Sequence, residues 1–132
     1  KTFAADEFAV SEEAAKGIWN VWSFGPALLD ADGGRKTSFD TTVAEENPRT
    51  AIGYYEPGHY CIVIVNGRGT EGSRGYTMSQ LSALFEELGC AAAYNLDGGR
   101  SSVMAWDCGS SLVNSPASGG RPVCDIIYIP KE

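Results

Sequence analysis

A carboxylate beside two glycines is the clearest chemical feature of this sequence. Residues 95–102 read Asn-Leu-Asp-Gly-Gly-Arg-Ser-Ser after an apolar run. We therefore expect Asp97 at the carboxyl end of a buried strand, where open α/β sheets place their ligand sites. A carboxylate held there can act as a base, a nucleophile or a ligand anchor. The alternative is that Asp97 and Asn95 only hydrogen-bond the turn, and these residues alone favour neither interpretation.

A glycine-rich loop at residues 66–76 carries two arginines just ahead of an expected helix. Glycines let backbone amides approach a ligand, and a helix N-terminus attracts anions. Arg68 and Arg74 add planar donor groups suited to phosphate. The alternative, which these residues alone slightly favour, is a flexible surface loop whose arginines are solvated.

The same loop also spells G-x-G-x-x-G, the pattern of many dinucleotide-binding turns, at Gly67, Gly69 and Gly72. The helix begins at Thr77 rather than at the third glycine, and Asp97 is far along the chain for a ribose-binding carboxylate. The G-K-[ST] phosphate loop is absent. The spacing therefore argues against a dinucleotide site.

A third polar cluster runs through residues 114–116 and 119–122 and alone predicts a loop that enters an edge strand. His59 is the only histidine, and it follows Pro57-Gly58 in an expected turn. It has no second histidine to form a metal site. No G-x-S-x-G precedes a helix, so a nucleophile triad is excluded.

The elements that would position these clusters follow from the apolar pattern. Residues 50–55 and 60–65 predict two strands joined as a hairpin, the second apolar enough to be covered on both faces. A capping box at Thr77 and Gln80 begins a helix that ends at Gly89. With a strand at 91–96, this predicts one βαβ crossover at about 60–96 with parallel pairing.

The remaining segments complete a small α/β (α+β) domain. Ser11 is expected to cap a short helix that ends near residue 18, and residues 102–106 and 123–129 are expected to be strands. Residues 1–132 are thus predicted to form one domain, with a mixed, twisted sheet and helices packed on it.

Composition limits the class of partner. The 132 residues are 43% hydrophobic and 20% charged, as in an ordinary globular domain. A net charge of -7 gives no electrostatic basis for binding nucleic acid. No apolar run approaches the length of a transmembrane helix. Lys1 in place of an initiator Met indicates an artificial boundary or a cleavage point.

The four cysteines, Cys61, Cys90, Cys108 and Cys124, have spacings that fit no zinc pattern. Cys61 and Cys124 fall within apolar, strand-like runs, so we expect small buried hydrophobic side chains. One disulfide remains open as an alternative.

Six segments, in order from about Phe24 to Ile129, together resemble the phosphodiester glycosidase family. No single segment is diagnostic, and the Asn-Leu-Asp-Gly-Gly segment is the most specific. The family includes bacterial exopolysaccharide-related proteins and the mammalian enzyme that uncovers mannose 6-phosphate. The segments are Phe24-Gly25-Pro26, Asn47-Pro48-Arg49-Thr50-Ala51-Ile52-Gly53, Val65-Asn66-Gly67-Arg68, Ser73 through Thr77, Asn95-Leu96-Asp97-Gly98-Gly99 with Ser101-Ser102, and Asn114, Pro116 and Arg121.

The resemblance implies a hydrolase that cleaves the bond between a sugar's anomeric carbon and a phosphodiester, for example one carrying N-acetylglucosamine. Asp97 and Arg49 are the expected catalytic residues. The carboxylate would stabilise the oxocarbenium-like state or activate water, and positive charge would hold the phosphate. Substrate contacts are expected from Asn66, Arg68, Ser73, Thr77, Asn95, Gly98, Gly99, Arg100, Ser101, Asn114 and Arg121.

The same resemblance implies a carbohydrate phosphodiester as partner and a secreted or cell-surface location. No cofactor is predicted, and a divalent metal is left open, as are the sugar, the stereochemical outcome and the oligomeric state. The family's domain begins upstream with further strands, which implies that this chain lacks its N-terminal strands.

Three positions depart from the family pattern. Asn66 stands where the family usually has aspartate, Gln80 replaces a common glutamate, and Arg100 replaces a third glycine. An amide cannot act as a base, so a catalytic role of that aspartate would be absent here. Two alternatives therefore stay open: a hydrolase of related phosphate esters using the same site, and a non-catalytic carbohydrate- or phosphosugar-binding module.

Overall fold

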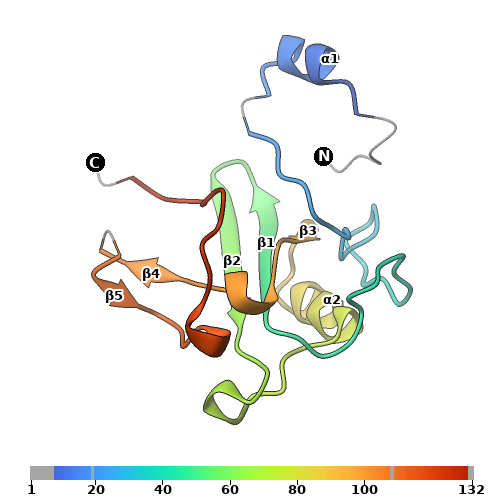
Figure 1. Ribbon diagram of the computed structural model, residues 1–132. Helices are drawn as coiled ribbons and strands as arrows, with labels where there is room; N and C mark the ends of the chain where they lie inside the picture. Colours follow the sequence, from blue (N-terminus) through green and yellow to red (C-terminus); the bar gives the residue numbers. More distant parts are fainter. Residues whose placement is uncertain (1–7, 19, 108, 131–132) are drawn as a thin grey trace.

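The computed structural model describes residues 8–18, 20–107 and 109–130. Within them the chain forms helices α1 (Val10–Ala15) and α2 (Met78–Glu87) and strands β1 (Arg49–Glu56), β2 (His59–Val65), β3 (Ala92–Asn95), β4 (Ala105–Trp106) and β5 (Ser111–Leu112). Figure 1 shows α2 beside the central sheet, the β4–β5 hairpin to one side, and α1 away from the sheet. The predicted class, a small α/β domain of helices and a sheet, is confirmed.

The main sheet has the order β2-β1-β3, and both pairings are antiparallel. The predicted hairpin is confirmed, with Arg49 opposite Val65 and Tyr54 opposite Tyr60. The predicted parallel pairing of the two crossover strands was wrong, because β1 lies between β2 and β3. The hairpin places β1 beside β2, and β3 then pairs with the free edge of β1. Helix α2 therefore crosses over β1, and the crossover strands run parallel without touching.

The core lies between the sheet and α2. Leu81 and Phe85 of α2 are fully buried, as is Ala51 at the centre of β1. Leu28, also fully buried, joins the same cluster from the segment that precedes the sheet. Burying each large apolar side chain stabilises the fold by roughly 1.5–3 kcal/mol. This packing fixes the strand ends where the polar clusters lie.

The predicted helix boundaries are confirmed for α2. Thr77 Oγ1 accepts a hydrogen bond from the Gln80 backbone at 3.2 Å, and Gln80 Oε1 accepts one from the Thr77 backbone at 2.8 Å. Gly89 follows the helix with a φ of 72°, a conformation that glycine adopts without strain. For α1, the cap is Ala9 rather than the expected Ser11, and the helix ends at Ala15 rather than near residue 18.

Two expected strands differ from the structure. Only Ala105–Trp106 of the expected strand 102–106 is a strand, and it pairs with β5 rather than with the main sheet. Residues 123–129 form no strand, and Ile126 and Ile129 are 75% and 87% exposed. An apolar run becomes a strand only when it pairs with another strand, and in the described structure residues 123–129 take part in no strand pairing.

The cysteine environments differ from one another. Cys90 is buried and Cys61 is partly buried, as expected of small apolar side chains. Cys124 is exposed, so the expectation that it is buried was wrong. The reason is that its segment forms no strand in the described structure. Cys108 lies outside the described residues. No helix in the described part of the chain has the length and apolarity to span a membrane.

Candidate functional site

The start of β1 lies beside the ends of β2 and β3, because both neighbouring strands run antiparallel to β1. A cavity of about 290 Å³ opens there. Its walls come from residues 47–49, from Asn95, and from the turn 97–100 that follows β3. Further side chains that line it are Phe24, Val43, Arg68 and Arg121. A concavity thus lies where these strand ends meet.

Asp97 is held in a small network at this cavity. Its Oδ2 accepts a hydrogen bond from Ser101 Oγ at 2.6 Å and forms an ion pair with Arg121 Nη2. Arg121 Nε also donates to Ser101 Oγ at 2.5 Å. The side chains of Arg121 and Asp97 are 49% and 42% exposed, so the pair remains open to solvent and to a ligand. The network keeps the carboxylate in one orientation.

Arg100 supports this network through the backbone next to Arg121. Its Nε and Nη2 both donate to the carbonyl oxygen of Gly120, at 3.0 and 2.6 Å. Gly120 directly precedes Arg121, so Arg100 anchors the segment that delivers Arg121 to Asp97. The residue in place of the family's third glycine therefore ties two loops together at the cavity.

Arg49 carries a buried positive charge. The residue is 2% exposed, and its Nε and Nη2 donate to the backbone carbonyls of Tyr76 and Val43, both at 2.8 Å, and to that of Glu45. Within the described residues, no carboxylate pairs with it. Burial lowers the pKa of the Arg49 guanidinium, because desolvation penalises its charged form. An arginine remains protonated even so, so the cavity wall is electropositive.

Asn95 presents an unused acceptor. The side chain is 1% exposed, and its Nδ2 donates to the Gly25 carbonyl at 2.8 Å. That bond fixes the orientation of the amide. Asn95 Oδ1 is buried and has no hydrogen-bond partner in the described structure. An unpaired buried acceptor is costly, and Asn95 is among the residues that line the cavity.

Glycines allow the Asp97 turn to approach β1 and Arg68. A Cβ on Gly98 would lie 2.6 Å from the Pro48 carbonyl oxygen, and one on Gly99 would lie 3.1 Å from Arg68 Nη2. The Gly99 amide donates to that same Pro48 carbonyl at 2.9 Å. Arg68 Nη2 donates to Asn47 Oδ1 at 3.1 Å. Gly98 thus lets the turn approach β1, and Gly99 lets Arg68 lie against the turn.

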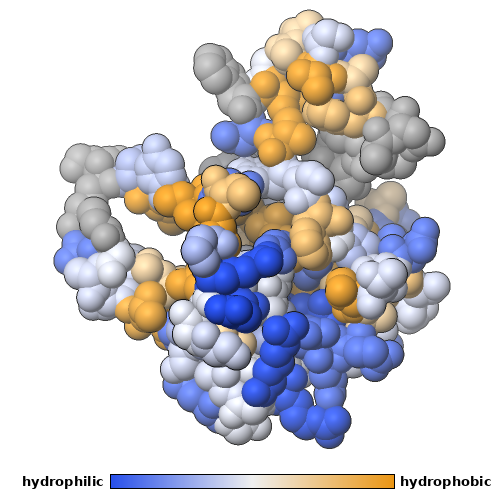
Figure 2. Space-filling model, in the orientation of Figure 1, coloured by the Kyte–Doolittle hydropathy of each residue, from blue (hydrophilic) through white to orange (hydrophobic). Residues whose placement is uncertain are grey.

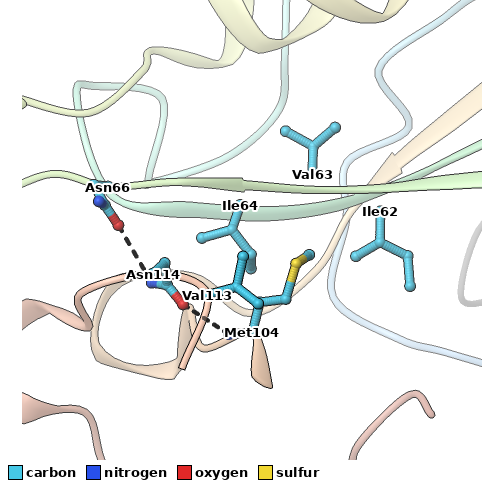
Figure 3. A pocket seen from close by; sticks show the side chains of 7 residues that line it. All are labelled: Ile62, Val63, Ile64, Asn66, Met104, Val113 and Asn114. Atoms are coloured by element: carbon cyan, nitrogen blue, oxygen red, sulfur yellow. Dashed lines mark hydrogen bonds between the residues drawn. The ribbon is translucent and has the colours of Figure 1, made fainter. Parts of the chain in front are cut away.

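Asn66 and Asn114 lie at a different place from Asp97. They line a second concavity, of about 440 Å³, together with apolar residues of β2 and the β4–β5 hairpin. Figure 3 shows the Asn114 amide directed at Asn66, with Ile62 and Ile64 on the same side of β2. Asn114 Nδ2 donates to Asn66 Oδ1 at 3.2 Å.

The Asn66 amide also binds a carboxylate. Its Nδ2 donates to Glu71 Oε2 at 2.7 Å, and Ser115 Oγ donates to the other oxygen of Glu71 at 2.6 Å. An aspartate at position 66 would place a second carboxylate against Glu71. Asparagine fits there because its amide donates a hydrogen bond to the Glu71 carboxylate. Sequence reasoning missed Glu71, because only the folded loop brings it back onto Asn66.

The expected site residues thus divide into three groups. Those that line the Asp97 cavity are Arg49, Arg68, Asn95, Asp97, Gly98, Gly99, Arg100 and Arg121. Asn66 and Asn114 line the second concavity. Ser73 Oγ donates to the Asn66 carbonyl at 2.6 Å, Thr77 caps α2, and Ser101 contacts Asp97, so these three hold protein groups in place.

The sequence clusters did not single out Asn47 and Phe24 as contributors to the cavity. Asn47 bonds to Arg68, and Phe24 is 51% exposed at the cavity. Phe24 belongs to a segment that resembles the family, which was the available signal. No group of three or more metal-binding side chains of the His, Cys, Asp and Glu types is assembled among the described residues.

Comparison with known proteins identifies the family. The sequence profile of the phosphodiester glycosidase family matches residues 4–130, so the chain belongs to that family. An uncharacterized SPbeta prophage-derived protein, YomE of Bacillus subtilis (strain 168), is 36% identical over 119 residues, which are 87% of this chain and 18% of the relative. A crystal structure of a hypothetical protein from Synechocystis aligns with a TM-score of 0.55 and 25% identity, over 74% of this chain and 18% of that one. The chain thus spans less than a fifth of either relative.

Proposed function

We propose that this protein hydrolyses the bond between a sugar's anomeric carbon and a phosphodiester, at the Asp97 cavity. The observation that carries the proposal is one cavity that contains both a carboxylate and a buried guanidinium without a carboxylate partner in the described structure. Membership of the phosphodiester glycosidase family supports the reaction class.

The substrate's phosphate is assigned to the arginine side of the cavity. Arg49 supplies a fixed positive charge, and Arg68, whose guanidinium has one side-chain bond to Asn47, supplies a more mobile one. Arginine binds phosphate oxygens through planar, charge-assisted hydrogen bonds. Charge held there stabilises the leaving phosphodiester as the bond breaks.

The sugar is assigned to the side formed by Asp97 and Asn95. A carboxylate near the anomeric carbon stabilises the oxocarbenium-like transition state or activates water. Asn95 Oδ1 accepts a hydrogen bond from a sugar hydroxyl or an N-acetyl N–H, which satisfies its unpaired acceptor. The phosphodiester leaves readily, so strong acid assistance is less necessary. A glycan phosphodiester is a substrate typical of the cell surface, and we place the protein there or outside the cell.

Asn66 does not supply a base in this scheme. Its amide is bound to Glu71 and lies in the second concavity. The departure from the family's aspartate therefore falls in the second concavity and not among the residues that line the Asp97 cavity.

A second candidate, a phosphosugar-binding module, rests on the ion pair between Arg121 and Asp97. A carboxylate that is already bound to an arginine and a serine is engaged with protein groups and is not free to contact a sugar. Turnover would require the ligand's phosphate to draw Arg121 away from Asp97, whereas simple binding would not.

Product analysis in isotopically labelled water separates these candidates. The chain is incubated with a phosphodiester of N-acetylglucosamine, alone and within a longer native chain. We expect free sugar that carries the label on its anomeric hydroxyl, because the carbon–oxygen bond breaks. Label in the phosphate would instead assign a phosphate-ester hydrolase. Binding without any product, from either length of chain, would assign the binding module.

The Asn95 assignment has its own test. We expect Asn95→Ala to raise KM about tenfold, since one sugar contact is worth roughly 1 kcal/mol or more. A substrate analogue that lacks the donor should lose affinity with the wild type and show no further loss with Asn95→Ala. Equal losses in both proteins would contradict the assignment.

A further inference from the structure

Two cysteine side chains meet in the core, far from each other in sequence. Cys61 lies on β2, and Cys90 follows the glycine that ends α2. Their Sγ atoms are 3.7 Å apart. This is contact distance for two sulfur atoms, and no other side chain separates them. A disulfide requires the two sulfur atoms to approach to about 2.05 Å, so the side chains must move toward each other.

Gly53 provides the space that the two sulfurs share. It pairs with Cys61 on one side of β1 and with Ala93 on the other. A Cβ at Gly53 would lie 2.7 Å from each of the two sulfur atoms and 2.8 Å from Phe85 Cε1. Any other residue at this position would push the sulfurs away, so the glycine at the centre of the sheet directs both into one space.

We propose that Cys61 and Cys90 are a disulfide-forming pair that cross-links β2 to the end of α2 under oxidising conditions. The oxidant is a small-molecule disulfide such as oxidised glutathione. The Cys61 thiolate attacks one sulfur of the oxidant, releases one reduced glutathione and forms a mixed disulfide. The Cys90 sulfur then attacks the Cys61 sulfur and expels the second glutathione. Two thiols lose their protons and electrons, and one disulfide is reduced to two thiols.

The order of attack follows from exposure. Cys61 is only partly buried, whereas Cys90 is 3% exposed. A bulky oxidant therefore reaches Cys61 first. Burial raises the pKa of the Cys90 thiol, which makes it a weak nucleophile. Its low exposure keeps external reagents away, and its contact with Cys61 at 3.7 Å makes the neighbouring sulfur its available partner. Tyr55 of β1 and Cys61 both pack against the core cluster that contains Cys90.

The cross-link would act on the segment that carries part of the site. The chain between the two cysteines contains residues 66–76 and all of α2, and Arg68 in it lines the Asp97 cavity. Closing this segment covalently removes conformational freedom from the unfolded chain. We expect the oxidised protein to melt about 10 °C higher than the reduced protein.

The test identifies which cysteines of the native chain are joined by a disulfide. The reduced protein is incubated with oxidised glutathione and then unfolded, so that any free thiols can be alkylated. It is then digested, and the peptide masses are measured by mass spectrometry. We expect a cross-linked peptide pair joining Cys61 to Cys90, lighter than the two free peptides by the two thiol hydrogens. We also expect a melting temperature that falls when reductant is added. Full alkylation of both cysteines would overturn the proposal.

A matched background removes other pairings. Cys108→Ser with Cys124→Ser leaves only the proposed pair, and we expect this variant to keep the reductant-dependent melting temperature. Adding Cys61→Ser to that background should abolish the dependence, and Cys90 should then be found as a free thiol. A cross-link between Cys61 and either removed cysteine in the native chain would also overturn the pairing.

Discussion

At the scale of single residues, Arg49 combines a structural role with the proposed chemical one. Its guanidinium donates to three backbone carbonyls, those of Val43, Glu45 and Tyr76, which belong to two different loops. These bonds hold the cavity wall and orient the charge. A variant at this position should therefore lose stability as well as activity.

We expect Arg49→Met to lower the free energy of unfolding by about 3 kcal/mol, because buried carbonyls lose charged donors. Urea unfolding of the variant and the wild type measures the difference. Arg35→Met is the control, since Arg35 is exposed and pairs only at the surface with Glu86. Its cost should stay near 0.5 kcal/mol. Equal stability of Arg49→Met and the wild type would show that the carbonyls need no arginine.

The Asn66–Glu71 contact predicts a pH-dependent effect. In Asn66→Asp, two carboxylates would meet where an amide now donates at 2.7 Å. Their repulsion raises both carboxyl pKa values in the folded state above those in the unfolded state. The loss of stability is therefore present at neutral pH, at about 1–2 kcal/mol, and disappears as pH falls and the carboxyls become protonated.

Urea unfolding at neutral and acidic pH checks this expectation, with Asn66→Asp combined with Glu71→Gln as the control. The double variant removes the repulsion and should recover most of the stability at neutral pH. A single variant that is as stable as the wild type at neutral pH would mean that the two side chains do not interact.

At the scale of elements, the bounds of helix α2 could be predicted from the sequence because residues within and next to the helix determine them. The Thr77 cap, the apolar stripe and Gly89 all act within the helix itself. The hairpin of β1 and β2 is likewise local. Strand order is not local, so the position of β1 between β2 and β3 could not be read. The same holds for residues 123–129, whose pattern fits a strand but which pair with no strand in the structure.

We expect Thr77→Ala to destabilise the protein by about 1 kcal/mol, because the first turn of α2 loses its side-chain acceptor. Thermal unfolding followed by circular dichroism measures this cost. Thr42→Ala is the matched control, an exposed threonine in a loop, and should change little. If the two variants melt together, the capping box contributes nothing to stability.

The candidate site shows the same division between local and distant information. Asp97 and its glycines were predicted, because the strand and the turn lie next to each other in the sequence. The contact between Arg121 and Asp97, and the one between Asn66 and Glu71, depend on loops that meet only in the fold. The expected site residues therefore divide between two concavities and a third group that holds protein groups in place.

At the scale of the whole molecule, one face exposes apolar side chains. Figure 2 shows hydrophobic surface on the side of the β4–β5 hairpin and near the N-terminal segment. Trp106 is 75% exposed, and Ile126 and Tyr128 are similarly open. Exposed apolar surface promotes association.

We expect the chain to bind a hydrophobic dye and to elute from a sizing column earlier as its concentration rises. Replacing Ile126 and Ile129 together by serine should reduce both effects without lowering the melting temperature, because neither side chain belongs to the core. Dye binding that is unchanged in this double variant would place the apolar surface elsewhere.

The central claim is that the carboxylate of Asp97 performs chemistry in the cavity. The most direct measurement is the rate of free-sugar release from a phosphodiester of N-acetylglucosamine by Asp97→Asn and by Asp40→Asn, an exposed carboxylate outside the cavity. We predict that Asp97→Asn lowers kcat by about a thousandfold, with an unchanged melting temperature, and that Asp40→Asn retains wild-type turnover. Wild-type turnover in Asp97→Asn would contradict the assignment of the reaction to this carboxylate.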